Sequence, residues 1–274
     1  MAKQELLIYG VKHQTDGFPI AKKQLDAIDL NGKRIGVELP DDFIRKYKLP
    51  MQRDALEGSL RRSILIYAGH KPEKVGAMDI DALRSAFRDE DMKAAYGARK
   101  FWYDMLQYLY RKGAKVVALE DPKLLKQIRD CKIMILKAEN RKDDIEVSAT
   151  RLEEEYITNF TRVDAMATKI KPEGLDMMLV GNIHLDYLGK QAMQLPNVRA
   201  TKRDLCPPKS TEEAEKLEKY AKYVEGVRQF YLKMRLRKRK VARVRARLGP
   251  NLLKRGNVFL FRNEKARRRP KPKA

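Results

Sequence analysis

Two distant segments of the chain share the pattern Gly-x-x-His: GVKH at Gly10–His13 and GNIH at Gly181–His184. Each follows a short apolar run, ELLIY before the first and DMMLV before the second, and the chain has only three histidines. Imidazole is a good ligand for a borderline divalent ion. The repeated pattern therefore predicts two matched imidazoles at one rim of the fold. The glycine in each segment favours a tight turn that brings the histidine back over the preceding strand.

Acidic side chains and the third histidine follow other apolar runs. Glu38 lies in RIGVELP, Glu120 and Asp121 lie in AKVVALEDP, and His70 ends SILIYAGH. If these runs are parallel strands, their carboxyl ends meet at one edge, where ligands bind in open α/β sheets. Two imidazoles with one or two carboxylates suit zinc, iron, manganese or cobalt. The alternative to a metal site is a structural role, in which each histidine is a hydrogen-bonded turn residue and each acid before a proline caps a helix.

The elements that must position these residues alternate between strand and helix. Continuous apolar runs predict strands at 5–9, 34–40, 63–70, 114–122, 132–136 and 175–184. Helical spacing or acidic starts predict helices at 19–30, 41–49, 79–112 with a break near 97, 122–130, 148–170 and 185–193. This alternation is typical of an α/β fold with a mainly parallel sheet and helices on both faces.

A second region begins at the double proline Pro207-Pro208. A helix capped by Ser210 or Thr211 is expected to run to residue 249, amphipathic first and basic later, followed by a disordered basic tail. The predicted organisation is an α/β domain at 1–205, a long helix at 206–249 and a tail at 250–274.

The end of the chain is intensely basic. Residues 232–274 carry eighteen Lys or Arg and one acid, Glu264, and the whole chain has a formal net charge of +23. Such a segment suits the backbone of RNA or DNA, or another polyanion. The expected contacts are Arg235, Arg237, Lys238, Arg239, Lys240, Arg243, Arg245, Arg247, Arg267, Arg268 and Arg269. A merely solubilising tail is the alternative.

The segments around the histidines resemble the superfamily that unites TraB/PrgY, Tiki, erythromycin esterase-like and ChaN-like proteins. GVKH, VELP, GAKVVALEDP, TRVDAMATKI and LVGNIHL carry the resemblance, which spans about residues 5–195. It implies a metal-dependent, hydrolase-like site. In that reading His13, His184, Glu38 and Asp121 are metal ligands, while Glu38, Glu120 and Arg162 serve catalysis. The chain departs from the family in having LEDP instead of an Asp-Arg pair, and in its basic tail.

Two functions follow as expectations. The first is a metal-dependent hydrolase, peptidase-like and acting on an unidentified peptide or small molecule, with a polyanion-binding tail. The second is a non-catalytic RNA- or ribosome-associated protein on a degenerate α/β scaffold. The aromatic stretch at 95–113 could stack bases, although at helical spacing it is more often core. Two separated cysteines, no signal-peptide pattern and no membrane-length apolar run favour a cytoplasmic protein.

Overall fold

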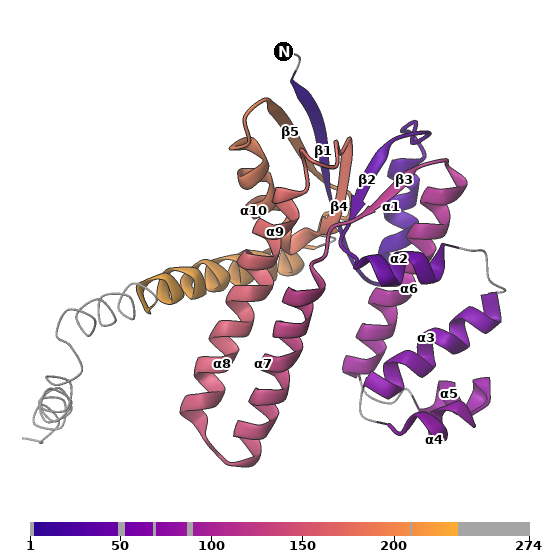
Figure 1. Ribbon diagram of the computed structural model, residues 1–274, viewed down its shortest axis with the longest axis vertical. Helices are drawn as coiled ribbons and strands as arrows, with labels where there is room; N and C mark the ends of the chain where they lie inside the picture. The colour runs from indigo at the N-terminus through magenta and orange to yellow at the C-terminus, as the bar shows by residue number, and fades with distance from the viewer. Residues whose placement is uncertain (1–2, 49–52, 68–69, 87–89, 209, 235–274) are drawn as a thin grey trace, which may run out of the picture. The chain divides into compact units, whose positions relative to one another are not determined.

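A five-stranded parallel sheet lies at the centre of the protein (Figure 1). The structure, a computed structural model, describes residues 3–48, 53–67, 70–86, 90–208 and 210–234. The strands are β1 (Gln4–Val11), β2 (Arg34–Val37), β3 (Lys115–Ala118), β4 (Met177–Gly181) and β5 (Val198–Asp204), in the spatial order β3-β2-β4-β1-β5. Every pairing is parallel, so all five carboxyl ends lie at one edge. The predicted α/β fold is confirmed.

Helices cover both faces of the sheet, and β1 shows how its residues are divided between them. Tyr9 and Val11 belong to an apolar cluster with α1 (Gly17–Leu25), α2 (Asp41–Tyr47) and α6 (Glu90–Arg111). Leu6 and Ile8 belong to a second cluster, with α9 (Arg162–Thr168) and α10 (Asn182–Met193). Side chains on a strand point alternately to opposite faces, which is why even and odd positions are both buried here.

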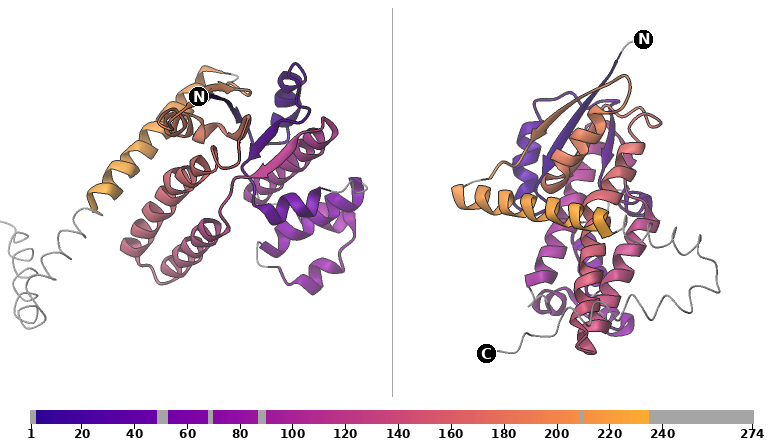
Figure 2. Two further views of the ribbon diagram at one scale, coloured as in Figure 1. Left: turned by 45° about the horizontal axis from the view of Figure 1, so that its top comes forward. Right: turned by 90° about the vertical axis from the view of Figure 1, so that its left-hand side faces the viewer.

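Two helical groups extend from this sandwich. The helices α3 (Arg53–Tyr67), α4 (Pro72–Gly76) and α5 (Ile80–Ser85) form a small apolar cluster that packs on α6. The helices α7 (Pro122–Asn140) and α8 (Asp144–Tyr156) lie side by side as a hairpin (Figures 1 and 2). A π-helical turn, η1 (Ile157–Thr161), joins α8 to α9.

Two predicted strands are helical. Residues 63–67 of the run predicted at 63–70 form the end of α3, where Leu56, Leu60 and Ile64 are buried four residues apart, the spacing of one helix face. The run at 132–136 lies inside α7, whose buried Cys131, Ile135 and Ala138 also follow a helical period. Short apolar runs do not by themselves distinguish a strand from a buried helix segment.

Other predicted elements also differ from the structure. The strand expected at 175–184 ends at Gly181, and α10 starts immediately after it. The strand β5 was not predicted, because VRATKRD is mostly exposed and charged, as sheet-edge strands often are. The helix α6 continues through Gly97 without a break, since an interior glycine costs only about 1 kcal/mol relative to alanine.

After β5 a helix spans residues 211–234 of the described chain. Ser210 caps it, because its Oγ accepts a hydrogen bond from the Glu213 N–H at 3.2 Å, as predicted. The chain divides into two compact units, Met1–Val224 and Glu225–Ala274, with a boundary inside this helix. The predicted basic half of the helix, the tail and all eleven expected nucleic-acid contacts lie at 235–274, outside the described residues. No helix among the described residues is both long and apolar enough to cross a membrane.

Candidate active site at the carboxyl ends of the strands

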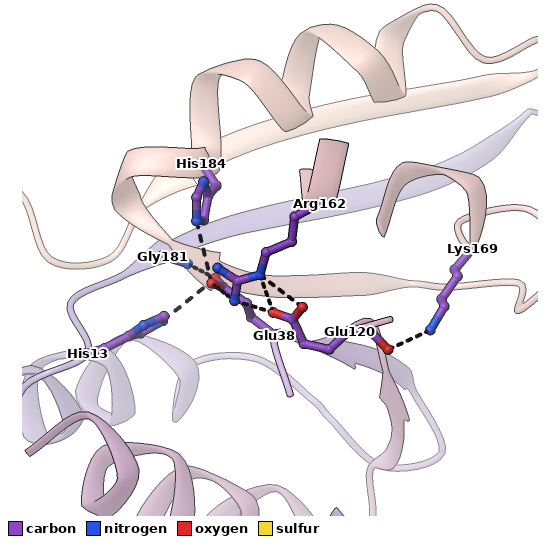
Figure 3. Close-up of polar contacts among 7 residues, drawn as sticks. All are labelled: His13, Glu38, Glu120, Arg162, Lys169, Gly181 and His184. Carbon is purple, nitrogen blue, oxygen red and sulfur yellow. Dashed lines mark hydrogen bonds and ion pairs between the residues drawn. The ribbon is translucent and has the colours of Figure 1, made fainter. Parts of the chain in front are cut away.

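The carboxylate of Glu38 is the centre of a buried polar group at the predicted edge of the sheet (Figure 3). Glu38 directly follows β2, and its Oε2 accepts a hydrogen bond of 2.6 Å from the Gly181 N–H at the end of β4. The His13 Nε2 atom lies 3.9 Å from Oε2, and the His184 Nε2 atom lies 3.5 Å from Oε1. The structure thus brings both Gly-x-x-His imidazoles to one carboxylate.

Arg162 joins this carboxylate to a second one. Its Nη2 donates to Glu38 Oε1 at 2.6 Å, and its Nε donates to both Glu120 oxygens at 2.7 and 2.9 Å; Nη2 also contacts Glu120 Oε1. Planar guanidinium groups favour such forked contacts. The guanidinium and the two imidazoles lower the pKa of Glu38 to about 2, against the opposing effect of burial. Burial raises the pKa of Glu120, although Arg162 opposes that shift.

The helix α9 holds Glu120 at two points. Arg162, its first residue, binds the carboxylate, and Lys169, just after its end, donates to the carbonyl oxygens of Ala118 at 2.9 Å and Glu120 at 3.3 Å. The π-helical turn η1 immediately precedes Arg162 and changes the direction in which the next side chains project. Sequence reasoning did not identify Lys169; its spacing of seven residues from Arg162, two helical turns, was the available signal.

The surroundings of both imidazoles favour their neutral form. Desolvation lowers the pKa of His13 and of His184 below the ordinary 6.5, and this effect outweighs the attraction of Glu38. His184 lies in the first turn of α10 and is almost fully buried. His13 packs against Trp102 of α6, with ring centroids 4.7 Å apart and ring planes tilted by 57°. Neutral rings keep one nitrogen lone pair, which can bind a metal ion or accept a proton.

Two sequence candidates lie outside this group. Asp121 caps α7, since its Oδ1 accepts from the Lys123 N–H at 2.8 Å. His70 is exposed and follows a helix, so the prediction that it ends a strand is wrong. The aromatic stretch of α6 is mainly core, with Phe101 and Trp102 buried. Conversely, sequence reasoning missed Asp204, which ends β5 at the same edge and accepts from Asn182.

The glycines of the two segments have a different role from the one predicted. Positive φ angles occur among the described glycines at Gly32, Gly113 and Gly174, not at the two segment glycines. Instead, these glycines allow close packing. A Cβ on Gly10 would lie 2.8 Å from Asn182 Oδ1, because α10 crosses directly over the end of β1. These glycines are therefore needed for lack of a side chain, and not for the tight turn that the sequence predicts.

The donor atoms suit a divalent ion in kind. The His13 Nε2 atom is buried and has no hydrogen-bond partner among the described residues, as expected of an atom that awaits a ligand. Each Glu38 oxygen retains a lone pair beyond its present hydrogen bond. Among the described residues, no group of three or more His, Cys, Asp or Glu is already arranged to hold a metal. The donor atoms are therefore of the right chemical type for a divalent ion. Arg162 already contacts both carboxylates next to them.

Comparisons with protein-family models, with curated proteins and with solved structures find no match for this chain. The resemblance of its motifs to the TraB and Tiki superfamily therefore stays a prediction from the sequence.

Proposed function

We propose that the strand-end group is the active site of a metal-dependent hydrolase. The observation that carries the proposal is the convergence of two imidazoles, the partly exposed ring of His13 and the buried ring of His184, on the Glu38 carboxylate at 3.9 Å and 3.5 Å. Groups of this kind are costly to bury without a function, because each ionised or unpaired polar atom loses its hydration. Hydrolysis also agrees with the activity that the sequence resemblance implies.

The ion would be held by His13, His184 and Glu38, and it would be zinc, manganese, cobalt or iron. Bound there, a divalent ion supplies a water whose pKa falls to about 7, so that hydroxide is available at neutral pH. Arg162 and Lys169 together balance the charges of Glu38 and Glu120. The support for a cation therefore comes from the donor atoms of the two imidazoles and the Glu38 carboxylate, not from a net charge.

The remaining residues divide the other tasks. Glu38, with a pKa of about 2, is a weak base and suits the role of ligand and orienter. Glu120 holds Arg162 by a fork of hydrogen bonds. Arg162 is slightly exposed at the rim, where its charge can stabilise an oxyanion that forms during hydrolysis. A donor of this type contributes roughly a hundredfold or more to turnover.

Metal analysis combined with a substrate screen tests this function. Wild type should contain about one divalent ion per chain and should cleave at least one of a panel of peptides, esters and amides supplied with zinc, manganese, cobalt or iron. His13→Ala and His184→Ala should lose both metal and activity, whereas His70→Ala, at an exposed position, should keep both. Equal metal content in all four proteins would remove the basis of the proposal, and turnover in the double histidine variant would place the chemistry elsewhere.

The basic end of the chain favours a second function, binding of RNA or DNA through the phosphate backbone. Eighteen cations and one acid in 43 residues are the observation in its support. Each neutralised phosphate of duplex DNA contributes about −0.9 to the slope of log affinity against log salt. Binding should therefore weaken steeply between about 50 and 200 mM salt. A chain that ends at residue 231 should lose this binding, and full salt-sensitive binding by that chain would refute the assignment.

The hydrolase and the polyanion-binding tail are compatible within one protein, because the tail would act on localisation and encounter. We expect the protein to work in the cytoplasm, where the thiols of Cys131 and Cys206, both free and buried, stay reduced. If the purified protein binds RNA but takes up no metal and cleaves no substrate, the non-catalytic, RNA-associated function is the one to retain.

A further inference from the structure

The two Gly-x-x-His segments are connected by a third segment, Asp204–Cys206, here called the strap. The strap begins with Asp204, the last residue of β5, and continues beyond the carboxyl end of that strand. At its centre, the Leu205 N–H donates to the Gly10 carbonyl at 2.9 Å, which ties the strap to the first segment. The Cys206 Sγ lies 3.6 Å from the carbonyl oxygen of Gly17, at the start of α1. Leu205 and Cys206 are both buried, so these contacts are shielded from water.

The strap reaches the second segment through Asn182. The Asn182 Nδ2 donates to Asp204 Oδ2 and to the Cys206 carbonyl, both at 3.1 Å. Asp204 is itself held in place, because its Oδ1 accepts from the Cys206 N–H at 2.8 Å. The Asn182 amide nitrogen thus donates two hydrogen bonds to the strap, while the amide oxygen lies close to Gly10.

Asn182 is also the first residue of α10, two positions before His184. The side chain of Asn182 therefore fixes the start of the helix that carries one imidazole, and the strap fixes that start relative to the strand that leads to the other imidazole. Backbone pairing between β1 and β4 stops at Val11 and Gly181, and beyond that point the strap adds hydrogen bonds that link the two segments.

We propose that Asn182 is a positioning residue, which holds the His184 imidazole against Glu38 and opposite His13 through its hydrogen bonds to Asp204 and Cys206. Its importance for turnover rests on the proposed hydrolase function, but its effect on the geometry of the site does not. Groups that orient metal ligands without touching the metal typically contribute ten- to a hundredfold to metal affinity.

The test compares Asn182→Ala with wild type by amide hydrogen exchange and by the ring signals of ¹⁵N-labelled histidine at fixed pH. With only three histidines in the chain, His70 serves as an internal reference. In Asn182→Ala, exchange should accelerate at least about tenfold in residues 181–186 and 10–14, while the rest of the sheet changes little. The ring signals of His184 and His13 should shift, and that of His70 should not. Zn²⁺ binding should weaken about tenfold.

Two further variants keep the test decisive. Asp204→Asn removes one acceptor with almost no change of shape, and it should show the same local pattern if Asn182→Ala fails to fold. Asp186 lies on the same helix as Asn182 and forms a surface ion pair with Lys202 of β5. Asp186→Asn removes this ion pair and should change neither exchange near the site nor the ring signals. Uniformly faster exchange with unchanged His184 and His13 signals would overturn the proposal. If wild type binds no Zn²⁺, the proposed metal site fails, while the exchange and ring signals still decide the role of Asn182.

Discussion

The imidazole of His13 lies against the position that a Cβ of residue 181 would take, so the histidine of one Gly-x-x-His segment uses the space left by the glycine of the other. A Cβ at residue 181 would be 3.2 Å from His13 Cε1 and 3.4 Å from Glu38 Oε2. The relationship is reciprocal, because Gly10 leaves space for Asn182 of the second segment. Since β1 and β4 are neighbouring parallel strands, the two segments end side by side and each shapes the other.

Gly181→Ala should therefore displace His13 and weaken the site. The added methyl group would press on His13 and Glu38, an overpacking that typically costs about 1–3 kcal/mol. We expect lower stability in urea titration and weaker Zn²⁺ binding by calorimetry. Gly226→Ala is the matched control, because nothing lies within 4 Å of a Cβ there, and it should be neutral or slightly stabilising within its helix. Full Zn²⁺ affinity in Gly181→Ala would show that His13 tolerates the crowding.

Arg162→Met should destabilise the protein by about 3–5 kcal/mol. The substitution keeps the volume but leaves the buried Glu38 and Glu120 carboxylates without their common counter-charge. Arg162→Lys keeps the charge but loses the forked geometry, so it should fall between wild type and Arg162→Met. Adding Glu120→Gln to Arg162→Met should recover part of the loss. The double-mutant cycle is measured by denaturant unfolding, and a strictly additive cycle would contradict a direct coupling between the two side chains.

Stability should fall as the pH drops below about 6.5. His13 and His184 have folded-state pKa values below 6.5, so the unfolded chain binds protons first and folding loses free energy as the pH falls from 6.5 through the folded values. The slope is at most about 1.4 kcal/mol per pH unit for each histidine. Glu38 contributes in a separate window, between 4.5 and about 2.

Chemical unfolding between pH 5 and 7.5 checks this dependence on the two imidazoles. His13→Gln/His184→Gln should flatten the curve over this range, while His70→Gln, which changes an exposed residue outside the site, should leave the slope as it is in wild type. A double variant that keeps the wild-type slope would assign the dependence to other groups.

Asp121→Ala should lower stability by about 1 kcal/mol without loss of metal, because this side chain caps α7. Asp121→Asn keeps a capping oxygen and should be nearly neutral. Thermal unfolding and elemental analysis of both variants separate the cap from the ligand role that the sequence resemblance implies. Loss of metal in both variants, with little change in stability, would restore Asp121 as a ligand.

The sequence by itself determined which side chains stand at the ends of the strands. Apolar runs before His13, Glu38, Glu120 and His184 predict buried parallel strands, and parallel strands present their carboxyl ends at one edge. The α/β class and the position of the site follow from this local pattern. The same reasoning failed for the run that ends at His70, because a short apolar run has no period of its own and the surrounding helix decided its conformation.

Only the tertiary structure decided how these side chains are paired. That Arg162 lies between Glu38 and Glu120 depends on the packing of α9 against the sheet. The Asp121 cap, by contrast, is a local contact and one of the alternatives that the sequence left open. The charged strand β5, which leads into the strap, has no apolar signature, since an edge strand is half exposed to water. The glycines are required because segments 171 residues apart in the chain meet within van der Waals distance, a contact that no local pattern contains.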